Sequence, residues 1–416
     1  MKSLSAREIR ILVFITLIAA LVITGLILAD LIVLRQTGVG GEFLLPWKAT
    51  RAYLFESVEP YSSTVSGYVQ EQVYGRTART GEEPYTLDLA FYLLLLYFPL
   101  GLFRDPAIAG AIWLFFCQAG FLAFIWLSLR LTDWEPRRPF LIAFFIGSAL
   151  SLYAVLGLLE NSQIFLLSLI YAGILISLSM EMDELAGALM ALAFYQWEVG
   201  ALFLLLVSLR AYDQQRWRVL AGFGMVTGLL LAISFFIYPG WLIPFLRSQV
   251  ISLRADYGFS PAMVFSRLWP DLGGSLAWIL TLLLGIILIL EWSVARRGKF
   301  RDFYWAACLT IAATPLLGFR TELENLVVLI LPWAFILSVV RERWKAGYWL
   351  AGLLLLLVLL VPWGLFVGSV LTRQIRLDII FLFMPVFTVI GLYWIRWWAL
   401  RPPRTWLERA VNMEYR

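Results

Sequence analysis

Glu42 is the first residue of this chain whose type and place could do chemistry. It follows the glycine-rich run Gly38–Gly41, which we expect to be flexible. A carboxylate that is partly buried can have its pKa shifted and take a proton as a general base. Lys48, Arg51 and Tyr53 follow, and a helix would present them within two or three turns of Glu42. The segment therefore suggests acid–base chemistry, although an ordinary solvated loop acid would have the same sequence.

Other polar clusters punctuate the apolar sequence further along the chain. They comprise a turn with Glu160, Asn161 and Gln163, the pair Gln196 and Glu198, and a charged turn with Arg320, Glu322 and Glu324. Polar groups at the membrane boundary are costly and by default suggest a site. Ion pairs that merely hold a helix bundle together are the competing explanation.

A further segment from 238 to 271 carries Arg247, Arg254 and Arg267 between aromatic and apolar residues. Arginine suits bidentate recognition of phosphate, and the apolar side chains could lie along an acyl or isoprenoid chain. An amphipathic helix at the membrane surface, with arginines reaching toward water, fits equally well.

The amino-acid composition indicates that these residues belong to a membrane protein. Of the 416 residues, 61% are hydrophobic and only 15% are charged, which is too apolar for a soluble globular protein. The chain contains no histidine, so Ser-His-Asp catalysis and the HExxH zinc site are excluded and a general base must be a carboxylate. Neither a basic stripe for nucleic acid nor a glycine-rich phosphate loop for ATP is present.

An all-α polytopic membrane bundle is therefore expected, as a single integral-membrane domain over residues 1–416. A span needs about 20 apolar residues, and basic clusters mark cytoplasmic loops. Working between these clusters gives about twelve transmembrane helices and places both termini in the cytoplasm. The expected spans are 11–34, 107–129, 140–158, 164–180, 185–196, 198–209, 219–237, 273–291, 303–318, 325–340, 348–367 and 379–397.

The run Leu87–Phe103 does not fit this alternation. It is short and is interrupted by Pro99, and a crossing here would carry the basic loop Arg130–Arg138 to the outer face. We therefore expect a re-entrant or interfacial helix on the outer face. The first outer loop then extends over 35–106, and a second covers 238–272. The polar clusters described above all fall on the outer side of this topology.

At this point the sequence resembles the GT-C superfamily of membrane glycosyltransferases, and within it family 87, whose members use polyprenol-phosphate sugars as donors of mannose or arabinose. The resemblance covers roughly the first 230 residues. In that family the first span is followed by an acidic residue, then by a helix of aromatic and small residues, then by a Pro-Tyr element. The segment GGEFLLPWKATRAYLFESVEPYS is similar in this order, with Glu42 and Glu59-Pro60-Tyr61 in the corresponding places. Gln163 corresponds to the glutamine of a Gly-Gln turn, but Gln196-Trp197-Glu198 replaces a Lys-Pro pair and Glu42 replaces the usual aspartate.

The resemblance implies a catalytic module over 1–237 and variable C-terminal helices over 273–416. It implies inverting transfer of a mannose- or arabinose-like sugar from a polyprenyl-phosphate donor to a glycolipid, glycan or other hydroxyl acceptor on the outer face of the cell membrane. Glu42 would be the catalytic base. The implied substrate-binding residues are Lys48, Arg51, Tyr53, Tyr61, Glu160, Gln163, Gln196, Glu198, Arg254, Arg320 and Glu322.

No organic cofactor is expected, and a divalent metal is compatible with the reaction but is not indicated by any residue pattern. The expected partners are the lipid-linked donor, the acceptor and membrane lipids, with no nucleic acid. Two other classes of protein remain open. A carrier of lipid-linked substrates would line a path to both faces with polar groups, and a catalytically inactive relative or scaffold would tolerate the loss of Glu42.

Overall fold

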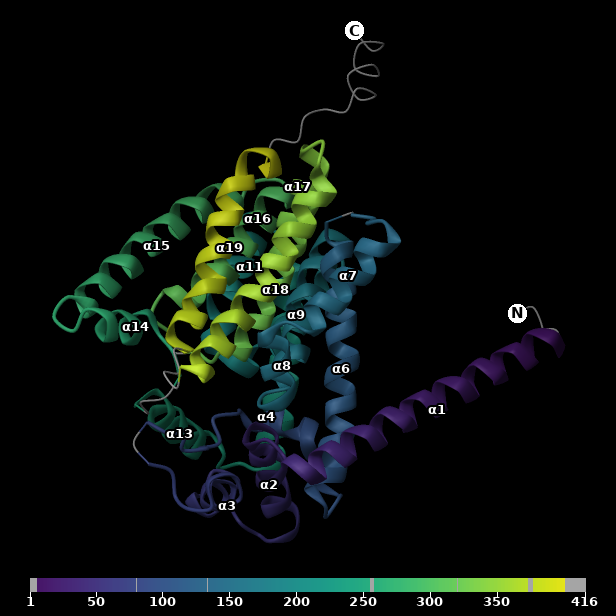
Figure 1. Ribbon diagram of the computed structural model, residues 1–416. Coiled ribbons are helices and arrows are strands. Elements are labelled where there is room, and N and C mark those ends of the chain that lie inside the picture. Colours follow the sequence, from purple (N-terminus) through teal and green to yellow (C-terminus); the bar gives the residue numbers. More distant parts are fainter. Residues whose placement is uncertain are drawn as a thin grey trace. The chain divides into compact units, whose positions relative to one another are not determined.

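The computed structural model describes residues 6–79, 81–132, 134–254, 258–319, 321–372 and 377–400. Helices joined by turns and irregular segments make up these ranges, and they contain no β-strand. An isolated bridge pairs Phe259 with Thr321. In chain order the helices are α1 (Ala6–Thr37), α2 (Gly41–Phe55), α3 (Ser63–Tyr74), α4 (Phe91–Leu94), η1 (Leu95–Tyr97), α5 (Phe98–Gly101), α6 (Pro106–Arg130), α7 (Arg138–Ala149), α8 (Leu152–Leu159), α9 (Gln163–Ser179), α10 (Asp183–Leu192), η2 (Ala193–Gln196), α11 (Trp197–Asp213), α12 (Trp217–Ile237), α13 (Leu242–Arg254), α14 (Pro261–Leu268), α15 (Gly273–Ala295), α16 (Phe300–Ala313), η3 (Thr314–Leu316), η4 (Glu324–Leu329), α17 (Ile330–Arg343), α18 (Gly347–Leu371) and α19 (Leu377–Leu400) (Figure 1).

Seven helices within the described ranges are long and apolar enough to cross a membrane, or eight if the bent pair α7 and α8 forms one span. The seven cover Thr16–Thr37, Pro106–Arg130, Trp217–Ile237, Gly273–Ala295, Glu324–Arg343, Gly347–Leu371 and Leu377–Leu400. The expectation of an all-helical membrane protein is thereby confirmed. The expected total of about twelve spans stays a prediction, because several of the predicted spans form helices that are shorter than a bilayer requires.

Internal contacts divide the chain into two compact units. Unit 1 comprises 1–120, 158–163 and 233–256, and unit 2 comprises 121–157, 164–232 and 257–416. Aromatic rings form the core of unit 1: the Tyr97 ring centroid lies 4.7 Å from that of Trp113 and 6.2 Å from that of Phe43. All three side chains are buried. Because Phe43 belongs to the first turn of α2, this cluster fixes the start of that helix in the core.

The run that was expected to be re-entrant forms a broken helix, consisting of α4, η1 and α5. Pro99 lacks the N–H that would continue the α-helical bonding pattern, and the preceding residues Leu95–Tyr97 adopt a 3₁₀ turn. Arg51 of α2 then donates to the carbonyl oxygens of Gly101 and Phe103 at 3.0 and 3.1 Å. These bonds satisfy carbonyls that the end of α5 leaves without an intrahelical partner.

The residues from Pro84 to Leu89 form an irregular segment whose main-chain carbonyls accept hydrogen bonds from side chains of α3, of α13 and of the turn between α2 and α3. We call it the Pro84–Leu89 segment. Its carbonyl oxygens accept from Ser66 and Gln70 at Pro84, from Ser248 at Leu87, from Gln249 at Asp88 and from Tyr61 at Leu89. Because each of these carbonyls has a specific donor, the path of the segment is fixed without a β-ladder.

In unit 2 the helices α16, α17, α18 and α19 pack against one another (Figure 1). Tryptophan side chains in this bundle find polar partners, as Trp333 does with the Thr388 hydroxyl at 2.9 Å. Arginines close helix ends here too. Arg210 donates to the carbonyl oxygens of Ala295, the last residue of α15, and of Gly298 just beyond it, at 2.9 and 3.1 Å. Arg301 donates to the carbonyl oxygen of Ala399 near the end of α19 at 2.6 Å.

Candidate functional site

Glu42 is the second residue of α2 and is half-buried. Only residues 38–40 separate α2 from the end of α1, and Gly38 adopts a φ of 87°, which a residue with a side chain rarely tolerates. A negative charge in the first turn of a helix is stabilised by the helix dipole. The chain therefore fixes a carboxylate directly beyond the first span.

Two glycines before Glu42 allow other segments to approach the backbone closely. A Cβ atom at Gly40 would lie 3.1 Å from the carbonyl oxygens of both Leu159 and Glu160. A Cβ atom at Gly41 would lie 2.2 Å from Cε1 of Tyr85, a distance that real atoms do not adopt. The sequence suggested that these glycines supply flexibility, whereas the structure shows that they supply space.

Gln163 links the first turn of α2 to the aromatic core of unit 1. Its Nε2 donates to the main-chain carbonyl oxygen of Glu42 at 2.7 Å, and its Oε1 accepts from the Tyr97 hydroxyl at 2.6 Å. Gln163 and Tyr97 are both buried. Of the residues predicted from sequence, Glu42 and Gln163 are therefore brought together, and the main chain of Glu160 lies against Gly40.

Tyr85 is a neighbour of Glu42 that the sequence did not single out. It has a φ of 44° in the left-handed region, which is strained for a residue with a side chain. Burial, followed by the charge of Glu83, the neighbouring Tyr74 and the charge of Glu42, raises the pKa of Tyr85 above its ordinary value. Its signal in the sequence was a second Glu-Pro-Tyr element at 83–85, which resembles the one at 59–61.

Asn161 is a second such residue, and it lies in the turn between α8 and α9. It is 1% exposed, and neither atom of its amide has a hydrogen-bond partner among the described residues. Buried amides in native proteins are nearly always satisfied, because an unmade hydrogen bond costs about 1–3 kcal/mol. The neighbours of Asn161 in sequence contact Gly40 and Glu42, so this amide belongs to the same corner of unit 1.

The two predicted cations of α2 have partners within unit 1. Lys48 pairs with the Glu56 carboxylate at 2.8 Å and lies 4.7 Å from the centre of the Tyr68 ring. Arg51 holds the end of α5, as described above, and lies over the rings of Trp47 and Phe55. These contacts give both cations a structural role, and their contact with substrate stays a prediction.

The two predicted tyrosines of the first loop also bind main-chain carbonyls. The Tyr53 hydroxyl donates to Ile237 at 2.8 Å, and the Tyr61 hydroxyl donates to Leu89 at 2.9 Å. Burial raises the pKa of Tyr61 far above its ordinary value, so this hydroxyl remains a neutral donor. Both tyrosines thus anchor the elements that surround Glu42.

The remaining predicted residues lie elsewhere. Gln196 and Glu198 belong to unit 2, where both are half-buried. Close packing continues just after them, because the hydroxyl of Tyr171 lies 2.0 Å from the position that a Cβ atom would take at Gly200. Glu322, also in unit 2, is half-buried in the turn before η4. Arg320 and the side chain of Arg254 lie outside the described residues.

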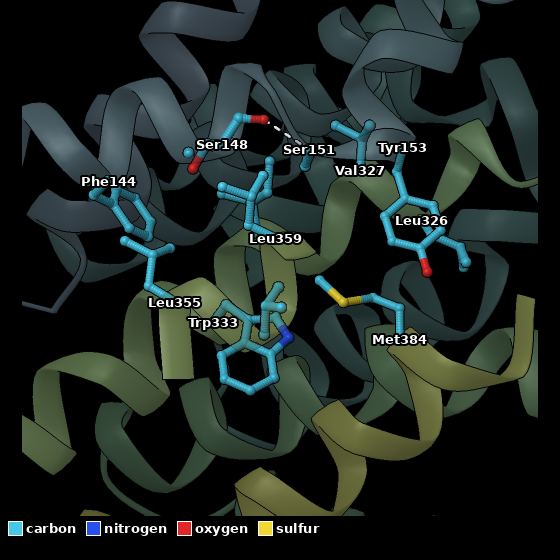
Figure 2. A pocket seen from close by; sticks show the side chains of 13 residues that line it. Phe144, Ser148, Ser151, Tyr153, Leu326, Val327, Trp333, Leu355, Leu359 and Met384 are labelled. Atoms are coloured by element: carbon cyan, nitrogen blue, oxygen red, sulfur yellow. Dashed lines mark hydrogen bonds between the residues drawn. The ribbon is translucent and has the colours of Figure 1, made fainter. Parts of the chain in front are cut away.

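A cavity of about 30 Å³ lies in unit 2 among α7, α8, η4, α17, α18 and α19 (Figure 2). Apolar side chains such as Phe144, Leu355 and Met384 line it, and the Ser151 hydroxyl turns to the carbonyl oxygen of Ser148 at 2.8 Å (Figure 2). Its volume would hold about two water molecules. It is too small for a sugar, and we treat it as a packing defect beside the 49° bend between α7 and α8.

Within the described ranges, no group of three or more His, Cys, Asp or Glu side chains has an arrangement that could hold a metal ion.

Comparison with known proteins adds no relative to this picture. No protein-family model, curated protein or solved structure matches the chain.

Proposed function

We propose that this protein is a membrane glycosyltransferase that moves a mannose- or arabinose-like sugar from a polyprenyl-phosphate donor to a hydroxyl acceptor, with inversion, and that Glu42 is the base. The observation that carries the proposal is the setting of Glu42. It stands at the start of α2 directly after the first span, with its backbone held by Gln163 and with Tyr85 packed on the preceding residue. We place this site on the outer face, with both termini in the cytoplasm.

In this reaction the acceptor O–H bond breaks and its proton passes to the Glu42 carboxylate. The acceptor oxygen attacks the anomeric carbon from the face opposite the phosphate. The bond between that carbon and the phosphate oxygen breaks, and its electron pair leaves with the polyprenyl phosphate. A positioned base of this kind contributes about 10²–10⁴-fold to the rate.

The leaving phosphate carries negative charge that cations would stabilise. Lys48 and Arg51 are engaged with Glu56 and with the end of α5, so other arginines are needed. Arg247 of α13 is exposed, and Arg254 and Arg320 remain in the proposal as they were predicted. The exposed apolar residues of α13, among them Ile243 and Leu246, suit the start of a lipid chain.

Transfer by the purified protein in lipid vesicles tests this proposal. Polyprenyl-phosphate mannose, arabinose and glucose, each radiolabelled, are offered with a membrane glycolipid extract. We expect transfer by the wild type and a loss of at least about 10²-fold in Glu42→Gln. Glu71→Gln makes the same change at an exposed position of α3 and should retain activity.

Two outcomes would count against the proposal. Equal activity of Glu42→Gln and the wild type would remove Glu42 as the base. Absence of transfer with all three donors, from protein that unfolds cooperatively, would favour a carrier or an inactive relative.

A further inference from the structure

Arg343, the last residue of α17, carries a buried guanidinium whose hydrogen-bonding capacity is largely unused. Its side chain is only 8% exposed, and its Nε and Nη2 atoms have no hydrogen-bond partner among the described residues. An oxygen of the half-exposed Glu342 carboxylate lies 3.7 Å from Nη2, which is an ion pair but too long for a hydrogen bond. A buried charge is costly unless it is both paired and hydrogen-bonded. The guanidinium is therefore suited to an anion that the described part of the chain does not supply.

A second arginine adds positive charge at the same place. Arg301, near the start of α16, donates to the carbonyl oxygen of Ala399 at 2.6 Å. Trp398 precedes Ala399, and its ring packs on that of Trp344, the residue after Arg343, with centroids 4.9 Å apart. The start of α16 thus meets the ends of α17 and α19 here, and the charge of Arg301 acts on Arg343. Two like charges in one place favour the binding of an anion.

This corner of unit 2 adjoins a face of α19 that is suited to lipid. Ile390, Trp394 and Trp397 are spaced by four and three residues, so they lie on one side of the helix, and all three side chains are exposed. The Trp394 ring also contacts that of Trp344, with centroids 5.0 Å apart. Tryptophan favours the boundary between the hydrocarbon core and the lipid headgroups. A lipid whose headgroup reaches Arg343 would therefore have an apolar helix face for its acyl chains.

We propose that Arg343, with Arg301 beside it, binds the phosphate of an anionic phospholipid. The planar fork of arginine can donate two hydrogen bonds to phosphate oxygens, and basic pockets between transmembrane helices recognise anionic headgroups. Because α19 leads to the C-terminus, which we place in the cytoplasm, this lipid belongs to the inner leaflet. The inference concerns unit 2 alone and does not depend on sugar transfer.

Thermal unfolding of the full-length protein in detergent tests the site. Dioctanoyl phosphatidylglycerol is added in increasing amounts, and dioctanoyl phosphatidylcholine and inorganic phosphate serve as the zwitterionic lipid and the soluble anion. A ligand that binds only the folded state raises the unfolding temperature by mass action. We expect phosphatidylglycerol to stabilise the wild type more than either of the other two.

Variants of Arg343 assign this stabilisation to the site. Arg343→Gln should need at least about tenfold more phosphatidylglycerol for the same rise in unfolding temperature, because charged hydrogen bonds are lost. Arg343→Lys should need an intermediate amount, since lysine keeps the charge but lacks the fork. Arg341→Gln is the matched control. It removes the same charge from the same end of α17, but the Arg341 side chain is exposed and lies over the Tyr348 ring, so we expect a change of less than about twofold.

Several results would overturn the inference. An equal response of Arg343→Gln and the wild type to phosphatidylglycerol would remove Arg343 from the site, and an equal loss in Arg341→Gln would indicate diffuse charge instead of a built site. Equal stabilisation of the wild type by phosphatidylcholine or by inorganic phosphate would exclude an anionic lipid as the specific ligand. Lower stability of Arg343→Gln without lipid, together with an unaltered response to phosphatidylglycerol, would restrict Arg343 to stabilising the carbonyl end of α17.

Discussion

The ring of Tyr85 occupies the space that a side chain at residue 41 would need. This relationship joins two segments that are far apart in sequence, the start of α2 and the Pro84–Leu89 segment. It also makes the absence of a side chain at Gly41 a requirement of the site.

Gly41→Ala should therefore displace Tyr85. The added methyl group would lie 2.2 Å from Cε1 of Tyr85, and overpacking of this kind typically costs about 1–3 kcal/mol. We expect lower thermal stability in detergent and at least about tenfold slower transfer, as for other misplaced catalytic groups. Gly67→Ala in α3 adds the same methyl group into open space and should stabilise by about 0.5–1 kcal/mol. Equal stability of the two variants would contradict the close approach.

Gln163 should couple to Tyr97 in a double-mutant cycle. Gln163→Leu removes the donor to the carbonyl oxygen of Glu42 and the acceptor of the Tyr97 hydroxyl, and each lost bond costs about 1–3 kcal/mol. Tyr97→Phe removes the donor to the Gln163 oxygen and keeps the Gln163 bond to the Glu42 carbonyl. We expect the double variant to be less destabilised than the sum of the two single ones, by about 0.5–3 kcal/mol. Strict additivity of the unfolding free energies would show that this bond has no energetic role.

Asn161 should behave unlike an ordinary buried polar residue. Because no described partner binds its amide, Asn161→Leu removes an unsatisfied group and fills its volume. We expect the free energy of unfolding to stay equal or to rise by up to about 2 kcal/mol. Asn161→Ala is the matched control, since it removes the amide but leaves a cavity, and it should be less stable than the leucine variant. Strong destabilisation of both variants would mean that the amide is satisfied in the folded protein.

Arg51 offers a test between a structural and a substrate-binding role. Arg51→Lys keeps the charge but loses the fork that reaches both Gly101 and Phe103. We expect a loss of about 1–2 kcal/mol in stability and less than about a twofold change in the KM for the donor. A large rise in KM with unaltered thermal stability would instead support the substrate contact that the sequence predicted.

The ion pair between Arg76 and Glu82 should make the loop after α3 sensitive to acid. The Arg76 hydrogen bonds, with a further bond from the Arg79 main chain, lower the pKa of Glu82 to about 2. The folded-state pKa lies below the ordinary value of 4.5, so the contribution is present above pH 4.5 and is lost as the pH falls toward 2. We expect acid proteases to cut this loop faster over that range. Glu82→Gln should be cut equally fast at both ends of the range, and a persistent pH effect in that variant would exclude Glu82 as its cause.

Periodicity and composition predicted the helical membrane architecture because a bilayer leaves few alternatives to a helix. The sequence also predicted a helix directly after the first span and an interruption at Pro99, both from local signals. Glu42 and Gln163 were selected from sequence order alone, and the structure brings them together.

Other features of the site have no local signal. The pairing of Arg51 with the end of α5, or of Tyr53 with Ile237, depends on which distant carbonyls the fold leaves without a partner. The Glu-Pro-Tyr element at 83–85 marks Tyr85 in the sequence, but its left-handed φ has no local signal, because that conformation runs against the preference of a tyrosine. Ser66 and Gln70 of α3 hold the preceding carbonyl oxygen in place. Gly40 and Gly41 suggested flexibility, since a sequence does not show what approaches a glycine.

The discontinuous make-up of unit 1 has a consequence for how the protein is made. Glu42 is among the first residues to leave the ribosome, but Gln163 is added only after α6, α7 and α8. Ser248 and Gln249, which hold Leu87 and Asp88, come later still, in α13. During synthesis the carbonyl groups of Glu42, Leu87 and Asp88 therefore enter the membrane region before the side chains that hydrogen-bond them have been made. We therefore expect nascent chains that end before α13 to be the species on which membrane chaperones and quality-control proteases act.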